Sequence, residues 1–348
     1  MYGYAFRRVF IKINTGLEAI YKKSTPIIRA FFNYSSYIRA KYYNKTCVSS
    51  FNATLTPKKM KFLNLVYIVI SLFISVVNLT AQNPSPASQR IGLCLSGGGA
   101  LGYAHIGALQ ALEEAGIRPT HISANSMGSI VGVLYAAGIS PADMLRMIEQ
   151  EKGYRIHSLF DVNLGKNFGF MKHDKLRKVL DKYIPYNNFD SLQTKFYVCC
   201  VDIRRGEVKI VSQGNKLKDY VIASSSIPLL YEYCVIEGVE YVDGGIKNNF
   251  PLEPLLEEKC DKIIGINVIN FTPSDTTIKA EDLLSNLYAI IDESINEHKY
   301  KQCDFYVPIK GLNSYKYSTV SYKRYKEIYQ IGYENMKAYI EQHPEILE

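Results

Sequence analysis

Two side chains of this sequence could act together as a nucleophile and its base. Ser126 lies in Ala124-Asn125-Ser126-Met127-Gly128, and Asp243 begins Asp243-Gly244-Gly245. Each motif directly follows an apolar, strand-like run. A serine hydroxyl group becomes a nucleophile when a neighbouring base accepts its proton. Ser126 and Asp243 are therefore the first candidates for catalytic chemistry.

The serine motif has the setting of a nucleophile elbow, a sharp turn from a strand into a helix. A strand is expected over 120–124 and a helix over 126–137. Small flanking residues let the two pack closely, and here they are Ala124, where glycine is usual, and Gly128. The alternative is that Ser126 only caps the helix. The motif alone leaves both interpretations open.

The choice of base rests on what surrounds each titratable residue. None of the six histidines stands in a comparable glycine-flanked loop at the end of a strand, and His105 falls inside an expected helix as a core histidine. Asp-Gly pairs are common in turns, so Asp243 could be purely structural. As a partner for Ser126, it makes a Ser/Asp dyad more economical than a Ser/His/Asp triad.

A glycine-rich loop, Ser96-Gly97-Gly98-Gly99-Ala100-Leu101-Gly102, joins another strand-like run to a helix-like run. Glycines let backbone N–H groups point into one cavity, and a helix N-terminus adds partial positive charge. A phosphate group or an oxyanion would suit such a loop. A dinucleotide site needs an acid about 20 residues further on, where 121–123 contain none, and the Gly-Lys-Ser/Thr of a P-loop is absent. A structural turn is the remaining alternative.

The elements that position these motifs alternate between strand and helix. Alternation of this kind favours a layered α/β domain with a mainly parallel sheet. One domain, 91–345, accounts for the pattern. The strands are expected at 91–95, 120–124, 196–203, 207–212, 239–242 and 263–269, and the helices at 101–115, 126–137, from 140, 281–298 and 321–341.

Charge is concentrated at the front of the chain. The net charge is +8, but residues 1–61 hold 12 Lys and Arg against one acid, while 62–348 hold 29 against 32. The body is mildly acidic, so nothing in it calls for a nucleic-acid partner. Hydrophobic residues make up 47% of the chain, enough for a large core, and a disordered or collagen-like chain is excluded.

Residues 60–81 have the pattern of a secretory signal peptide: a basic start, a short apolar stretch and a small residue, Ala81, at its end. Cleavage after Ala81 would export the protein to the periplasm, the outer membrane or the medium. The alternative is a single-pass anchor at 62–81. Residues 82–90 form a linker. Residues 1–59 are a basic, Tyr-rich extension. Either translation starts at Met60 and these residues are not part of the protein, or they form an arm in the cytosol or at a membrane surface.

Cysteines point to no cofactor. The sequence has no Cys-x-x-Cys and no Cys/His cluster, so we expect neither a zinc site nor another metal. Cys94, Cys199 and Cys200 lie inside strand-like runs, where buried free thiols are expected.

In their order along the chain, the three motifs resemble the patatin-like phospholipase family, including its lysophospholipase domains of the neuropathy-target-esterase type. The resemblance runs from Ile91 to about residue 310. It is carried by 91–99 with Ala104-His105-Ile106-Gly107, by 126–132, by Ala223-Ser224-Ser225-Ser226-Ile227-Pro228, and by 241–245 with Asn248-Asn249-Phe250-Pro251.

The resemblance implies a three-layer α/β/α fold and a calcium-independent lipid acyl hydrolase of the phospholipase A or lysophospholipase type, without a cofactor. It implies that Ser126 is the nucleophile and Asp243 the base, and that the substrate is a lipid met at a membrane surface. The oxyanion hole would comprise Gly97, Gly98, Gly99 and Met127. The residues expected to support the motifs are Gly102, Ala124, Gly128, Gly244 and Gly245.

Leu101 departs from the family, which usually has Arg or Lys there. Leucine at this position removes a cation beside the oxyanion loop. It leaves open the alternative that the protein binds lipid but is catalytically weak or dead. An acyltransferase is a second alternative, although that type prefers histidine before its serine, where this chain has Asn125.

Overall fold

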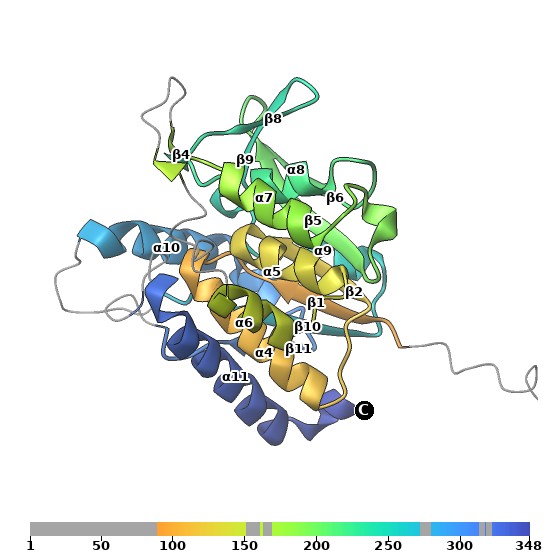
Figure 1. The fold of residues 1–348 in the computed structure, drawn as a ribbon. Coiled ribbons are helices and arrows are strands. Elements are labelled where there is room, and N and C mark those ends of the chain that lie inside the picture. Colours follow the sequence, from red (N-terminus) through yellow and green to blue (C-terminus); the bar gives the residue numbers. More distant parts are fainter. Residues whose placement is uncertain (1–88, 151–160, 163–168, 272–279, 313–316, 318–321) are drawn as a thin grey trace, which may run out of the picture. The chain divides into compact units, whose positions relative to one another are not determined.

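The computed structural model describes residues 89–150, 161–162, 169–271, 280–312, 317 and 322–348 (Figure 1). They lie in one compact unit, Pro86–Glu348. The expected extension 1–59, the signal or anchor segment 60–81 and the linker up to residue 88 lie outside the described residues. Within the described part, no single helix is long and apolar enough to cross a membrane, although the bent pair 126–136 and 141–150 passes that test jointly, by length and composition.

The central sheet is mixed and mostly parallel. Its strand order is β11-β10-β1-β2-β5-β9-β8, and β6 pairs with β5. The four pairings from β11 to β5 are parallel, and the pairings among β5, β6, β8 and β9 are antiparallel. The strands are β1 (Ile91–Leu95), β2 (His121–Asn125), β5 (Lys195–Asp202), β6 (Glu207–Val211), β8 (Cys234–Ile236), β9 (Val239–Asp243), β10 (Lys262–Asn267) and β11 (Phe305–Pro308).

Both faces of this sheet are covered, which gives the expected three-layer α/β/α arrangement. Along β1, Leu93 and Leu95 belong to the main hydrophobic core, while Cys94 faces a second core around Phe250 and Leu255. Successive side chains of a strand point to opposite faces, so the two cores lie on opposite sides of the sheet. Helices α4 (Tyr103–Glu114), α5 (Ser126–Ala136) and α11 (Tyr325–Gln342) line the first core, and α9 (Glu253–Glu257) the second.

Glycine allows an unusually close crossing of α4 and α11, which lie side by side in Figure 1. A Cβ atom at Gly107 would lie 2.0 Å from the carbonyl oxygen of Tyr329, and one at Gly332 would lie 2.0 Å from that of Ala104. The two backbones therefore meet without side chains between them.

The remaining elements surround this core. A small sheet joins β3 (Asp161–Val162), β4 (Gly169–Lys172) and β7 (Leu229–Tyr231) in the order β3-β4-β7. The other helices are α6 (Pro141–Gln150), α7 (Asp174–Tyr183), α8 (Leu217–Ser224) and α10 (Ala280–Tyr300), and the 3-10 turns are η2 (Gly99–Gly102), η4 (Phe189–Ser191), η5 (Gly244–Ile246), η6 (Tyr322–Arg324) and η7 (Pro344–Leu347).

Strand register places the candidate motifs together. Leu95 at the end of β1 pairs with Ala124 in β2, so the glycine loop and the serine turn leave the same edge of the sheet. Asn125 pairs with Cys199 in β5, and the next residue, Cys200, pairs with Asp243 at the end of the antiparallel β9. Two parallel strands and one antiparallel strand thus bring Asp243 next to the turn that holds Ser126.

Candidate active site

Ser126 occupies a strained turn between β2 and α5. Its φ angle is +50°, in the left-handed region that residues with a Cβ atom rarely adopt. Its backbone N–H group donates a hydrogen bond to the Ser224 hydroxyl at 2.9 Å, which in turn donates to Asn125 Oδ1 at 3.3 Å. The strained turn is the geometry of a nucleophile elbow and goes beyond what a helix cap requires.

The elbow is possible because the neighbouring positions lack bulk. A Cβ atom at Gly128 would lie 2.5 Å from the carbonyl oxygen of Ser96, and one at Gly102 would lie 2.1 Å from Met127 Cγ. Ala124, where glycine is usual, is fully buried at the end of β2. The small residues therefore let β1, β2 and the two following helices approach one another at Ser126.

Asp243 is buried beside Ser126, with 1% of its surface exposed. Its Oδ1 atom accepts hydrogen bonds from the N–H group of Gly245 at 2.7 Å and from Asn125 Nδ2 at 3.0 Å. Burial raises the pKa of Asp243 to about 6, although the Ser126 hydroxyl and these two donors lower it. Oδ2 has no hydrogen-bond partner with good geometry among the described residues. An unpaired carboxylate oxygen next to a serine hydroxyl can accept its proton.

Two glycines let the chain pass close to Asp243. A Cβ atom at Gly244 would lie 2.4 Å from Asn125 Oδ1, and one at Gly245 would lie 3.0 Å from Asp243 Oδ1. A Cβ atom is therefore excluded at Gly244 unless Asn125 moves, whereas at Gly245 it would require only small shifts of the neighbouring side chains.

Two asparagine side chains join the base to the glycine loop. Asn125 Nδ2 donates to Asp243 Oδ1 and also to Asn249 Oδ1, both at 3.0 Å. Asn249 Oδ1 also accepts from the backbone N–H group of Gly97 at 3.1 Å. Asn125 and Asn249 thus hold the positions of the dyad and the loop relative to each other.

Two glycines of the loop have N–H groups without a hydrogen bond. Gly98 and Gly99 line the same pocket as Ser126 and Asp243, and neither has a hydrogen-bond partner for its N–H group among the described residues. Met127, at the start of α5, is also without such a partner there. Gly97 differs from the expectation that it belongs to the oxyanion hole, because its N–H group is taken by Asn249. In this structure Gly97 anchors the loop.

The residue that departs from the family pattern, Leu101, lies in the main core with 4% of its surface exposed. A Cβ atom added at Gly98 would lie 3.5 Å from Leu101 Cβ, so the leucine side chain starts close to the glycine loop. A cation at this position would be buried without water, whereas leucine contributes packing.

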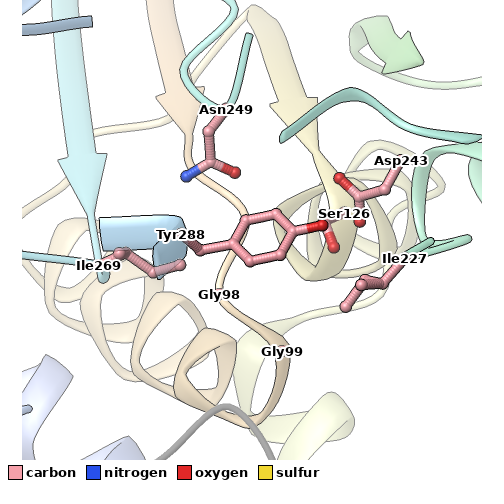
Figure 2. A pocket seen from close by; sticks show the side chains of 8 residues that line it. All are labelled: Gly98, Gly99, Ser126, Ile227, Asp243, Asn249, Ile269 and Tyr288. Atoms are coloured by element: carbon pink, nitrogen blue, oxygen red, sulfur yellow. The ribbon is translucent and has the colours of Figure 1, made fainter. Parts of the chain in front are cut away.

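A small pocket, part of it open to solvent, joins these groups (Figure 2). Ile227, Ile269 and Tyr288 add an apolar wall to the polar groups of the dyad and the loop. The eight described residues that line it are Gly98, Gly99, Ser126, Ile227, Asp243, Asn249, Ile269 and Tyr288. The arrangement combines a hydroxyl group, a base and free N–H donors with an apolar surface.

Among the described residues, no histidine lines this pocket. His105 is fully buried, as expected for a core histidine, and its Nε2 atom hydrogen bonds with the Ser96 carbonyl at 2.8 Å. Burial lowers the pKa of His105 to about 4. The expected buried thiols Cys94, Cys199 and Cys200 are free and fully buried. Over the described ranges, no three His, Cys, Asp or Glu side chains come together as a metal site would require.

Comparison with known proteins agrees with this geometry. Residues 93–256, which hold the glycine loop, Ser126 and Asp243, match the family model described as patatin-like phospholipase. This chain carries a patatin-like phospholipase domain. The matched range includes the glycine loop, the elbow and the aspartate turn, whereas the pocket residues Ile269 and Tyr288 lie beyond it.

Curated relatives of this patatin-like domain are fungal lysophospholipases. Lysophospholipase nte1 of Aspergillus niger is 26% identical over 283 residues, which cover 73% of this chain and 18% of the relative. Lysophospholipase NTE1 of Cryptococcus neoformans var. neoformans serotype D is 31% identical over 183 residues, covering 52% of this chain and 11% of the relative. This chain therefore spans less than a fifth of their length.

A solved structure shares the fold of the patatin-like domain. The crystal structure of VipD from Legionella pneumophila aligns with a TM-score of 0.50 at 15% identity, covering 73% of this chain and 67% of that one. It confirms the α/β architecture with a mixed, mostly parallel sheet.

Sequence reasoning missed the residues that hold and cover the dyad. Asn125, Ser224 and Asn249 stood inside the motifs, but residue type alone did not reveal which groups they bond. Tyr288 lies far along the chain on α10, in a stretch whose only signal was helical periodicity. The only sequence signal for Asn125, Ser224 and Asn249 was that each is a polar residue within or next to a motif.

Proposed function

We propose that this protein is a serine hydrolase that cleaves fatty acyl esters of phospholipids or lysophospholipids, without calcium. The observation that carries the proposal is the pairing of Ser126, at φ +50°, with the unsatisfied, buried Oδ2 atom of Asp243. A helix cap would need neither the strained turn nor a buried base. Family membership supports ester hydrolysis, and the lysophospholipase relatives support a lipid substrate.

In the first half-reaction, Ser126 Oγ attacks the ester carbonyl carbon while Asp243 Oδ2 accepts the hydroxyl proton. The carbonyl oxygen becomes an oxyanion, which the N–H groups of Gly98 and Gly99 stabilise, with that of Met127 as a further donor. Loss of one such donor typically slows an enzyme by about 10²–10³. Asp243 then returns the proton to the leaving alcohol oxygen, and an acyl-serine is formed.

In the second half-reaction, Asp243 takes a proton from water as the water oxygen attacks the acyl-serine carbonyl carbon. The same N–H groups stabilise the second oxyanion. Collapse of this intermediate releases the fatty acid and returns the proton to Ser126. The hydrogen bonds from Gly245 and Asn125 keep Asp243 oriented throughout.

Release of fatty acid from lysophosphatidylcholine and phosphatidylcholine tests the proposal. Purified full-length wild type and Ser126→Ala are compared in the presence of EDTA. We expect wild type to release fatty acid and Ser126→Ala to lose at least about 10³-fold in kcat, because the nucleophile is gone.

A matched control separates chemistry from stability. Ser140 caps α6 by accepting a hydrogen bond from the N–H group of Asp143 at 3.1 Å, and it is not a pocket residue. Ser140→Ala should lose about 1 kcal/mol of stability and keep its activity. Activity retained by folded Ser126→Ala would refute the role of Ser126, and EDTA-sensitive activity would refute calcium independence.

The proposed setting is a membrane surface reached by export or held by the anchor at 62–81. Both proposals rest on the sequence pattern of residues 60–81. Mass spectrometry of the mature N-terminus tests them, since cleavage would leave residue 82 first, and an anchor would leave 62–81 in place.

A further inference from the structure

Among the described residues that line the pocket, Tyr288 has the largest side chain. It projects from α10, and a Cβ atom at Gly245 would lie 3.1 Å from its Cε1 atom, so its ring packs on the aspartate turn. In Figure 2 the ring extends across the pocket from the side of Ile269, with its hydroxyl end toward Ser126. Burial, and after it the charge of Asp243, raises the pKa of Tyr288.

The ring occupies space that a substrate needs. With it in place the pocket has a cavity volume of only about 10 Å³, and Ser126 is 5% exposed. That is about the room for one water molecule, far below the roughly 300–1,000 Å³ of sites for small organic ligands. A long acyl chain must pass the ring to bring its carbonyl carbon to Ser126.

Tyr288 differs from the other polar members of the pocket in how it is held. Asp243 and Asn249 are fixed by hydrogen bonds to Asn125, whereas the Tyr288 hydroxyl group forms no hydrogen bond to any described residue. The contribution of Tyr288 is therefore the volume of its ring, which can be removed without breaking the network around the dyad.

We propose that Tyr288 determines which acyl groups this hydrolase accepts, by limiting the length of chain that fits beside Ser126. The proposal rests on the proposed function. The ring favours short acyl groups and disfavours longer ones, because each added methylene group must displace it. Tyr288 acts here as a specificity-determining residue through its volume, and its hydroxyl group is not required for the chemistry.

The test is kcat/KM for p-nitrophenyl esters of two to twelve acyl carbons, used below their critical micelle concentrations. Full-length wild type, Tyr288→Ala and Tyr288→Phe are compared. Leu287→Ala is the matched control, because Leu287 precedes Tyr288 on α10 but is 46% exposed and does not line the pocket. Thermal unfolding and labelling by a small fluorophosphate show that each variant is folded with its serine accessible.

We expect the best chain length to become longer by several carbons in Tyr288→Ala. Each methylene group newly buried should raise kcat/KM up to about fourfold. Tyr288→Phe and Leu287→Ala should keep the wild-type profile, since the ring volume is unchanged in both.

An unchanged optimum in folded Tyr288→Ala would overturn the proposal. An equal loss at all chain lengths in Tyr288→Phe would also overturn it, because the hydroxyl group would then act in the chemistry. If wild type itself hydrolyses none of the esters, or if its activity survives Ser126→Ala, the proposed function fails, a result distinct from a failure of the Tyr288 proposal.

Discussion

At the scale of single residues, the site depends on a compromise at Asp243. The carboxyl group must be buried to meet Ser126, and burial raises its pKa to about 6. It must also be ionised to accept a proton. The donors Gly245 N–H and Asn125 Nδ2 reduce the cost of burying the charge. Asp243 is therefore mainly ionised at neutral pH, and its pKa is still close enough to neutral pH for efficient proton transfer.

This compromise predicts how activity depends on pH. Below about pH 6, Asp243 becomes protonated and can no longer accept the Ser126 proton. We expect kcat/KM for a neutral ester to be constant between pH 7 and 8 and to fall about tenfold per unit well below pH 6. Stopped assays with a buffer series at constant ionic strength measure the profile. A profile that stays flat down to pH 4.5, with the protein folded, would contradict the role of Asp243.

The residues that the structure brings together as expected are those whose type and local setting the sequence displays. Ser126, Asp243, Gly98 and Gly99 follow strand ends, and all four line one pocket. Their catalytic roles stay predictions. The role of Gly97 was not predictable, because it depends on Asn249, more than 150 residues away. A partner in space cannot be read from one sequence.

At the scale of elements, helix α5 must start very close to the end of β1. Gly128 allows this because a Cβ atom there would lie 2.5 Å and 2.8 Å from the carbonyl oxygens of Ser96 and Leu95. Gly132, one turn later on the same helix, has only side-chain neighbours at this range, with Phe196 Cε2 at 3.0 Å. Side chains can shift, whereas the backbone of β1 cannot.

The comparison of Gly128→Ala with Gly132→Ala tests this difference. We expect Gly128→Ala to lower the free energy of unfolding by about 1–3 kcal/mol more than Gly132→Ala. It should also reduce activity, because β1 carries the oxyanion loop. Urea unfolding followed by circular dichroism provides the measurement. Equal stabilities would show that α5 can move away from β1 freely.

Elements with long apolar runs were predictable, and those defined by distant pairing were not. The expected strands at 91–95, 120–124 and 263–269 correspond to β1, β2 and β10 within a few residues. The sequence showed strand-like runs for β6 and β9, but not that they pair antiparallel with β5. Helix α7 was missed, and the periodicity of α10 did not identify Tyr288 as its pocket residue.

At the scale of the whole molecule, the layers support the site from a distance. Helix α11 contributes no residue to the pocket, but it packs on α4, which follows the glycine loop. Their contact depends on Gly107 and Gly332, where the backbones touch. A substitution at this contact should therefore change the stability of the fold without changing any residue of the pocket.

The substitution Gly332→Ala should destabilise the fold, because its Cβ atom would lie 2.0 Å from the carbonyl oxygen of Ala104. We expect a loss of about 2–4 kcal/mol, despite the better helix propensity of alanine. The control Ala338→Gly, at an exposed position of α11, should cost about 1 kcal/mol. Differential scanning calorimetry measures both. A Gly332→Ala protein as stable as wild type would contradict the close crossing of α4 and α11.

The fold class was predictable because strand–helix alternation restricts the possible layers, and the three-layer sheet confirms it. The front of the chain is a different case. The signal or anchor at 60–81 and the extension 1–59 stay predictions from sequence, since the described residues begin at 89.

The central claim is that Ser126 is a nucleophile activated by Asp243. Its most direct test is the reaction of the purified full chain with a fluorophosphonate, followed by peptide mass spectrometry to locate the adduct. Wild type should carry one adduct, on Ser126, while Ser126→Ala carries none and Asp243→Asn reacts at least about 10²-fold more slowly. An adduct on another serine, or equal rates for wild type and Asp243→Asn, would contradict the claim.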